Sequence, residues 1–204
     1  MKNKSEQTKA KILAAALGEF STHGLAGARV DEIARSAGVN KAMIYYHFAG
    51  KEELFKELFH SEIEALQTEV NALMQHRNAD SETEMADAVR ELLAYVRSKK
   101  ELLIVLMAET VQPSLDPPPF FQLLDLSTAI GQEIVRTAKP DFPVDAEPVF
   151  YELFSGLLPL LYYVLLYERL AAYYHWDAAT LDERFIAFWL KQHGKFQGDH
   201  HERK

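Results

Sequence analysis

Apolar residues recur at every third or fourth position along most of this chain, which is the spacing of one face of an α-helix. No run alternates apolar and polar residues over the length of a strand, and no Asn-Gly or Asp-Gly pair marks a hairpin. The pattern predicts an all-α protein of about nine helices, with a three-helix N-terminal head and a larger helical-bundle body. The helices are expected over residues 5–23, 30–37, 41–47, 51–76, 82–98, 100–111, 120–138, 149–167 and 181–193.

Residues 30–48 describe two short helices joined by a tight turn. Gly38 supplies the positive φ that ends the first helix, and Asn40 is a good N-cap for the second. The second helix has to bury only Ile44 and Phe48. Its outward positions are then Lys41, Ala42, Tyr45, Tyr46 and His47. Two tyrosines beside a lysine and a histidine suit phosphates and base edges, so we interpret the segment as a DNA-binding helix-turn-helix.

Two consecutive segments carry a known signature, NKAMIYYHF at 40–48 and GKEEL at 50–54. Upstream positions agree in order and spacing, with ILAAA at 12–16, Phe20, HG at 23–24, DEIA at 31–34 and AGV at 37–39. Over roughly residues 5–58 the chain therefore resembles the TetR-type (TetR/AcrR) transcriptional regulators. The resemblance implies a homodimer joined through its last two helices, an operator of double-stranded DNA, and a small-molecule cavity in the body.

We expect particular contacts between the head and DNA. Lys41 and Ala42 are expected at base edges in the major groove, with Ala42 small enough to let the helix sit close. Phosphate contacts are expected from Tyr45, Tyr46, His47 and Lys51, and Asn40 is expected to cap the recognition helix. Many proteins of the family have Thr or Ser where this chain has Ala28 and Arg29. The hydroxyl cap is then missing, and Arg29 is the candidate for the phosphate contact.

Charge is divided unevenly along the chain. Its net charge of −8 argues at first against nucleic acid. Residues 1–50, however, hold seven Lys/Arg against four Asp/Glu, a net +3, and the other 154 residues hold 15 against 26, a net −11. The basic excess lies on the helix-turn-helix end, as a phosphate-binding surface requires. We expect a DNA-binding domain over 1–50, a ligand-binding and dimerisation domain over 51–193, and a disordered tail over 194–204.

The segment 149–167 is apolar nearly all round. A membrane span is one interpretation of that length, but Glu152 and Pro159 weaken it, so we expect no membrane partner. A buried helix that shares its faces between its own core and a partner is the other interpretation. The expected dimer interface is Leu157, Leu161, Val164, Phe185, Phe188 and Trp189. The twofold symmetry of such a homodimer would place its two recognition helices about 34–36 Å apart, which matches a near-palindromic operator.

Aromatic residues are concentrated in the body, where they line a cavity or fill a core. The candidate ligand-binding residues are Met107, Phe120, Phe121, Phe154, Tyr162 and Tyr163. Glu109 and Glu152 lie on otherwise apolar helices. If either is buried it favours a cationic ligand; the alternative is that both lie on the surface.

Other chemistry has little support in the sequence. The chain has no cysteine, so disulfides and thiolate metal sites are excluded. We expect no metal at His175, His193, His200 and His201, no cofactor and no enzyme, because no phosphate loop, nucleophile elbow or carboxylate pair occurs. With no cleavable signal visible, a cytoplasmic protein is expected.

These observations predict a homodimeric DNA-binding transcriptional regulator, a repressor released from its operator by a small hydrophobic or aromatic ligand in the C-terminal body. The alternative is a ligand-independent architectural or division-linked DNA-binding protein, in which the aromatic residues are purely structural.

Overall fold

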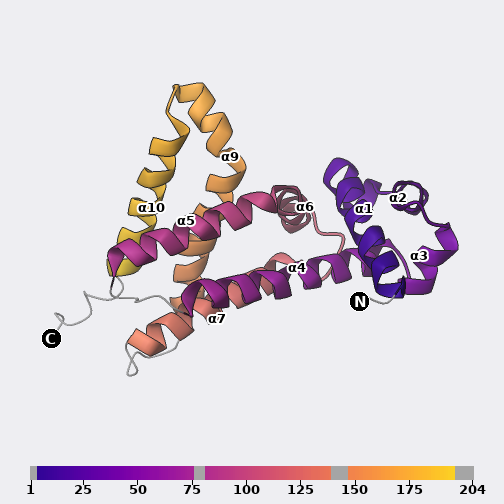
Figure 1. Cartoon of the computed structure of the whole chain (residues 1–204), viewed down its shortest axis with the longest axis horizontal. Coiled ribbons are helices and arrows are strands. Elements are labelled where there is room, and N and C mark those ends of the chain that lie inside the picture. The colour runs from indigo at the N-terminus through magenta and orange to yellow at the C-terminus, as the bar shows by residue number, and fades with distance from the viewer. Residues whose placement is uncertain (1–3, 76–80, 139–146, 196–204) are drawn as a thin grey trace. The chain divides into compact units, whose positions relative to one another are not determined.

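A computed structural model of the chain describes residues 4–75, 81–138 and 147–195, and within these ranges it is helical and contains no strand (Figure 1). The helices are α1 (Lys4–Gly27), α2 (Val30–Ala37), α3 (Lys41–His47), α4 (Lys51–Met74), α5 (Glu82–Ser98), α6 (Lys100–Val111), α7 (Phe120–Ala138), α8 (Glu147–Tyr151), η1 (Glu152–Leu157), α9 (Leu158–Tyr174) and α10 (Ala178–Lys195). Because α8, η1 and α9 form one continuous run, the described residues hold nine helices. The predicted all-α class is confirmed.

Local capping explains why most helices begin or end near the predicted residues. Ser81 accepts a hydrogen bond from the backbone N–H of Glu84 at the start of α5. Gly24 has a non-helical conformation (φ 66°, ψ 172°) inside α1, but helix resumes after it, so α1 continues to Gly27. Asp177 accepts from the N–H of Thr180, and α10 therefore begins earlier than predicted. Residues 76–80 and 139–146, which fall at or between the ends of predicted helices, and residues 196–204 of the predicted tail lie outside the described residues.

The chain divides into two compact units. Unit 1 consists of Met1–Leu66 and Glu101–Gln122, and unit 2 of Gln67–Lys100 and Leu123–Lys204. Helices α4 and α7 contribute residues to both units, and α6 lies in unit 1 except for its first residue, Lys100. The predicted boundary at residue 50 separates a DNA-binding domain from a ligand-binding domain. A division into compact units does not test such a functional boundary, so it stays a prediction.

The core of unit 1 is built around aromatic rings from α1 and α4. Phe20 is 1% exposed, and its ring meets that of Phe55 edge to face with centroids 5.4 Å apart. Phe59 stacks on the far side of Phe55. Helix α1 packs against α2, and α2 packs against α3. The two short helices are thus held in place by α1 and by their own buried residues.

The core of unit 2 lies between α5, α9 and α10. Helix α10 packs on both of the others, and Val164 and Ile186 are almost fully buried. Tyr163 of α9 stacks on Phe185 of α10, with ring centroids 3.9 Å apart and planes 4° from parallel. This stacking joins the two helices that Figure 1 shows as a hairpin.

Arg97 of α5 is the centre of a polar network inside unit 2. Its guanidinium donates two hydrogen bonds to Asp182 of α10, one of them 2.7 Å long, and lies 4.0 Å from the ring centroid of Tyr167. The hydroxyl of Tyr163 donates to the same Asp182 carboxylate. These hydrogen bonds, first that of Arg97, hold the pKa of Asp182 below its usual range, although desolvation opposes them. Three helices are therefore tied together by one carboxylate.

The apolar run before α9 contains a π-helical segment, η1. Each π turn admits one residue more than an α turn, and such segments are rare and concentrated at functional sites. Pro159 follows directly and lies inside the continuous helical run, where a proline removes a helical N–H donor, so the π turn and the proline interrupt the regular hydrogen bonding at the same place. The run Pro148–Tyr174 has the length and composition of a membrane span, as do core helices of proteins outside membranes, and a third of its most apolar window is buried. The absence of a membrane partner stays a prediction.

Candidate nucleic-acid interface

The turn between α2 and α3 is fixed by three local features. Gly38 takes a left-handed conformation (φ 67°), and the next N–H, of Val39, donates to the carbonyl of Ala34. The side chain of Asn40 accepts from the N–H of Ala42 at 2.9 Å, which is the predicted N-cap. On the inner face of α3, Ile44 is 0% exposed and Phe48, the residue that follows the helix, is 3% exposed. The predicted turn and anchors are therefore present.

The outer face of α3 presents the predicted side chains to solvent. Tyr46 is 77% exposed and Tyr45 51%, and Ala42 is exposed beside them. Lys41 forms an ion pair with Asp31 at 2.9 Å, and its hydrogen bond to that carboxylate is the largest cause of its raised pKa. Lys41 therefore remains charged, and a base edge would have to take the ammonium from Asp31.

His47 is placed differently from its neighbours. Its ring meets that of Tyr46 edge to face at 5.0 Å, and its Nε2 is covered and has no hydrogen-bond partner among the described residues. The covered Nε2 is not placed to contact a phosphate, and the predicted phosphate contact of His47 stays a prediction.

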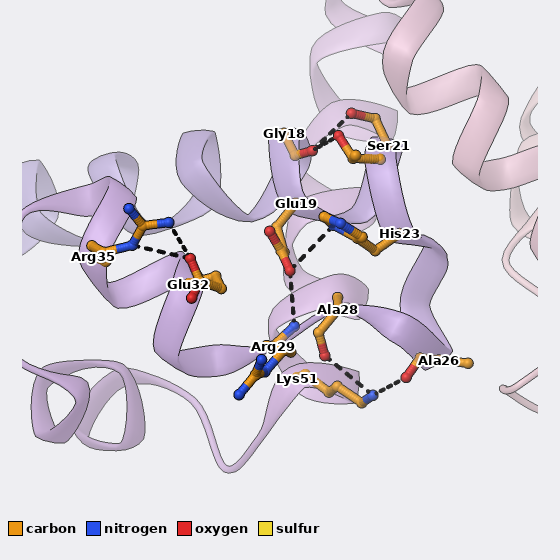
Figure 2. A network of polar contacts seen from close by, with 11 residues as sticks. Gly18, Glu19, Ser21, His23, Ala26, Ala28, Arg29, Glu32, Arg35 and Lys51 are labelled. Carbon is orange, nitrogen blue, oxygen red and sulfur yellow. Dashed lines mark hydrogen bonds and ion pairs between the residues drawn. The ribbon is translucent and has the colours of Figure 1, made fainter.

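The start of α2 is capped by a residue from another helix (Figure 2). Arg29, at the N-cap position of α2, makes no cap with its own side chain. Instead its backbone N–H donates to Oε1 of Glu19 at 3.1 Å, and His23 lies 3.4 Å from the same oxygen. Glu19 thus satisfies the backbone N–H of the N-cap residue, as the glutamate of a capping box does, and it does not replace the missing hydroxyl, which would accept from the N–H groups of the first turn. The exposed Arg29 side chain stays available for the predicted phosphate contact.

We expect Glu19→Ala to lower the free energy of unfolding by about 1 kcal/mol, the usual cost of losing an N-cap. The reason is that the backbone N–H of Arg29, the N-cap residue, loses its acceptor. Amide hydrogen exchange at Arg29 and in the first turn of α2 is the measurement. Glu19→Gln keeps an acceptor oxygen and is expected to protect these amides nearly as well; equal protection in the alanine variant would refute the cap.

Lys51, predicted as a phosphate contact, donates to main-chain carbonyls. Its Nζ lies 2.7 Å from the oxygen of Ala26 and 3.5 Å from that of Ala28 (Figure 2). Since an ammonium has three donors, one remains for a phosphate while the other two hold the loop between α1 and α2. Sequence patterns gave no sign of this second role, because the partners are backbone atoms more than twenty residues away.

The residues predicted at the dimer interface differ in exposure within the single chain. Leu157, Leu161 and Val164 are buried in the core of their own chain, at 4%, 2% and 0% exposure, and Phe185 and Trp189 are half-buried. Their part in a dimer interface stays a prediction. Phe188 is 52% exposed, and Tyr162 (49%) and Leu166 (37%) form the outer face of α9. Any partner surface on these helices therefore consists of their exposed aromatic and apolar residues.

The predicted ligand-binding residues are spread over both units. Met107, Phe120 and Phe121 belong to unit 1, and the other three, Phe154, Tyr162 and Tyr163, to unit 2. Within unit 2, Tyr163 is buried, donates a hydrogen bond to Asp182 and stacks on Phe185. Phe154 and Tyr162 are about half exposed. Ligand binding by these residues stays a prediction.

Comparison with known proteins gives matches at the N-terminal end. The family described as bacterial regulatory proteins, tetR family, matches residues 12–58. The transcriptional repressor SCO4008 of Streptomyces coelicolor is 47% identical over 58 residues, which is 28% of this chain and 30% of that protein. The matched segment thus spans about a third of the length of the curated relatives. It includes all of α2 and α3.

Solved structures match over nearly the whole chain at low identity. The regulator FadR of Bacillus subtilis, in complex with stearoyl-CoA, has a TM-score of 0.65 and 17% identity over 90% of this chain and 98% of its own. The fatty acid degradation regulator FadR of Bacillus halodurans has a TM-score of 0.64 and 21% identity over 100% of both chains. These likenesses show a shared all-helical fold. Residues 12–58 carry the sequence of the bacterial regulatory proteins, tetR family, and the chain around them has the fold of solved regulators of that family.

Proposed function

We propose that this chain is a homodimeric, DNA-binding transcriptional regulator that acts as a repressor and is released from its operator by a small ligand. The observation that carries the proposal is the solvent-exposed face of α3, with Lys41, Tyr45 and Tyr46 projecting from a helix anchored by Ile44 and capped by Asn40. A short helix presented in this way fits the major groove, while its polar side chains contact phosphates and base edges.

The distribution of charge also favours an orientation in which the N-terminal head faces the DNA. The net +3 of residues 1–50 attracts phosphates, and the net −11 of the remainder repels them. An excess of three charges gives a modest affinity, so two heads on one duplex are needed for tight binding. The exposed Tyr162, Leu166 and Phe188 on α9 and α10 are the surface through which we propose the two copies associate.

Release by a ligand is supported by the fold. A protein with this fold, the FadR of Bacillus subtilis, was solved with stearoyl-CoA bound. For the present chain we propose a ligand in the body that prefers the released conformation; a swing from 99% bound to 99% free requires a preference of about 5.5 kcal/mol. The proposal places the protein in the cytoplasm with its DNA, and assigns it no enzymatic activity.

The test is the affinity of the full-length protein for a duplex selected by it from a random-sequence pool. We expect Lys41→Ala to weaken binding about tenfold and to relax the preference at one base pair of each half-site. Lys56→Ala removes the same charge from an exposed position of α4 and serves as the matched control. Equal affinities for wild type and Lys41→Ala would show that α3 does not face the bases.

A further inference from the structure

Glu152, the first residue of η1, has a partly buried side chain inside unit 2. It accepts a hydrogen bond from the hydroxyl of Ser127 on α7, and no cation pairs with it among the described residues. Burial raises the pKa of this carboxyl, and the bond from Ser127 only partly opposes the rise. A carboxylate offers about four acceptor positions, so most of its capacity is unused.

Two glycines make room for this carboxyl. A Cβ placed on Gly156 of η1 would lie 2.5 Å from Oε1 of Glu152, closer than real contacts allow. A Cβ on Gly131 of α7 would lie 3.3 Å from Oε2. The carboxyl therefore occupies space that side chains at these two positions would fill.

A second polar group on the same side of α7 also lacks a partner. Thr128 is 8% exposed, and its buried hydroxyl has no hydrogen-bond partner within the described ranges. It lies one turn before Gly131, so it shares the face of α7 that meets the Glu152 carboxyl. A buried hydroxyl without a partner destabilises the folded protein unless a ligand or water satisfies it.

The fully buried glutamate of unit 1, Glu109, differs from Glu152 in its hydrogen bonds. Glu109 of α6 is 5% exposed, but it accepts the backbone N–H of Ser114 at 2.9 Å and lies 3.4 Å from the hydroxyl of the same residue. Its carboxyl closes the turn after α6. Glu109 thus has a hydrogen-bond donor near each of its carboxylate oxygens. Among the described residues Glu152 accepts only from Ser127, and the Thr128 hydroxyl has no partner.

We propose that Glu152 and Thr128 form a binding site in unit 2 for the protonated amine of an apolar ligand. The inference rests on the proposed ligand-gated function and names the chemical class of the effector. An ammonium has three donors and no acceptor, which matches two carboxylate oxygens and one hydroxyl oxygen. Its charge neutralises a carboxylate that burial otherwise disfavours, and a fatty acid or acyl phosphate would instead be repelled. The buried Leu124 and Leu157, on α7 and η1, provide apolar surface for the rest of the ligand.

Three probes of one shape test the site: 4-phenylbutylamine, 4-phenylbutanol and 4-phenylbutanoate, titrated calorimetrically into the full-length protein. We expect the amine to bind about tenfold more tightly than the alcohol, and the carboxylate most weakly, as a charged hydrogen bond predicts. Glu152→Gln, which keeps the size of the side chain, should bring the amine-to-alcohol ratio near one. Thr128→Val should reduce it several-fold. Asp125→Asn, an exposed charge change on α7, should leave it unchanged.

A wild-type ratio near one, or a ratio that Glu152→Gln does not change, would overturn the amine site. The proposed release of DNA by a ligand is tested separately. The measurement is the affinity of the protein for the selected duplex in the presence of a saturating concentration of each probe. Glu152-dependent amine binding without any change in duplex affinity would keep the site and refute the gating. Release of the duplex by the alcohol or the carboxylate, with no preference for the amine, would keep the gating and refute the site.

Discussion

Replacing Phe20 by alanine is expected to lower the free energy of unfolding of unit 1 by about 3–5 kcal/mol. Phe20 is 1% exposed and meets Phe55 edge to face, so truncation removes a large buried ring and leaves a cavity between α1 and α4. Since α1 supports α2, and α2 supports α3, the recognition helix loses its base. A loss of this size is a large part of the stability of a typical domain.

Amide hydrogen exchange measures this effect where tryptophan fluorescence does not, because Trp176 and Trp189 both lie in unit 2. The slowest amides of α1 and α2 are expected to exchange roughly two to three orders of magnitude faster in Phe20→Ala. Phe20→Leu retains most of the apolar contact and should cost about 1–2 kcal/mol. If the two variants exchanged alike, the packing of this ring would not be what stabilises the unit.

Replacing Arg97 by alanine is expected to cost unit 2 about 2 kcal/mol. A fully buried ion pair that loses one partner costs about 3–5 kcal/mol. The side chains of Arg97 and Asp182, however, remain 23% and 26% exposed, so water compensates in part. The substitution leaves Asp182 with the Tyr163 hydroxyl and removes the guanidinium from the face of Tyr167.

Chemical unfolding followed by the fluorescence of Trp176 and Trp189 measures this loss. The matched control is Arg90→Ala, because Arg90 joins the same two helices through Glu183 but lies on the surface; little change is expected there. A carboxyl whose folded pKa is depressed stabilises the fold above its unfolded pKa of about 3.9 and loses that contribution as the pH falls. The difference in the free energy of unfolding between wild type and Arg97→Ala should therefore become smaller below about pH 4. Equal losses of stability in Arg90→Ala and Arg97→Ala would contradict the network.

Features determined by neighbouring residues were predictable from the sequence. Gly38 and Asn40 specify the turn between α2 and α3 within a few residues, and Ile44 and Phe48 are the only large apolar residues on the inner face of α3. Signals of this kind act over one helical turn. They therefore give the helix boundaries and the exposed face without any knowledge of the tertiary structure.

Features that depend on distant residues were not predictable. Glu19 caps α2 from another helix, and no local pattern marks a side chain that reaches an N–H ten residues away. In a helix that is apolar on every side, periodicity does not distinguish the inner face from the outer one. Periodicity therefore did not predict that Leu161 and Val164 are buried within the single chain while Tyr162 is exposed; the dimer interface itself stays a prediction. The partial burial of Glu152 likewise depends on glycines in two different helices.

Selection of duplex DNA from a random-sequence pool by the full-length protein tests the central claim most directly. We predict that the recovered sequences share an inverted repeat whose half-site centres lie about one turn of the double helix, or a whole number of turns, apart. Lys41→Ala should recover the same repeat with one position in each half-site relaxed. Recovery of no common sequence, or of single unrepeated sites that Lys41→Ala binds equally well, would contradict a dimeric regulator that reads DNA through α3.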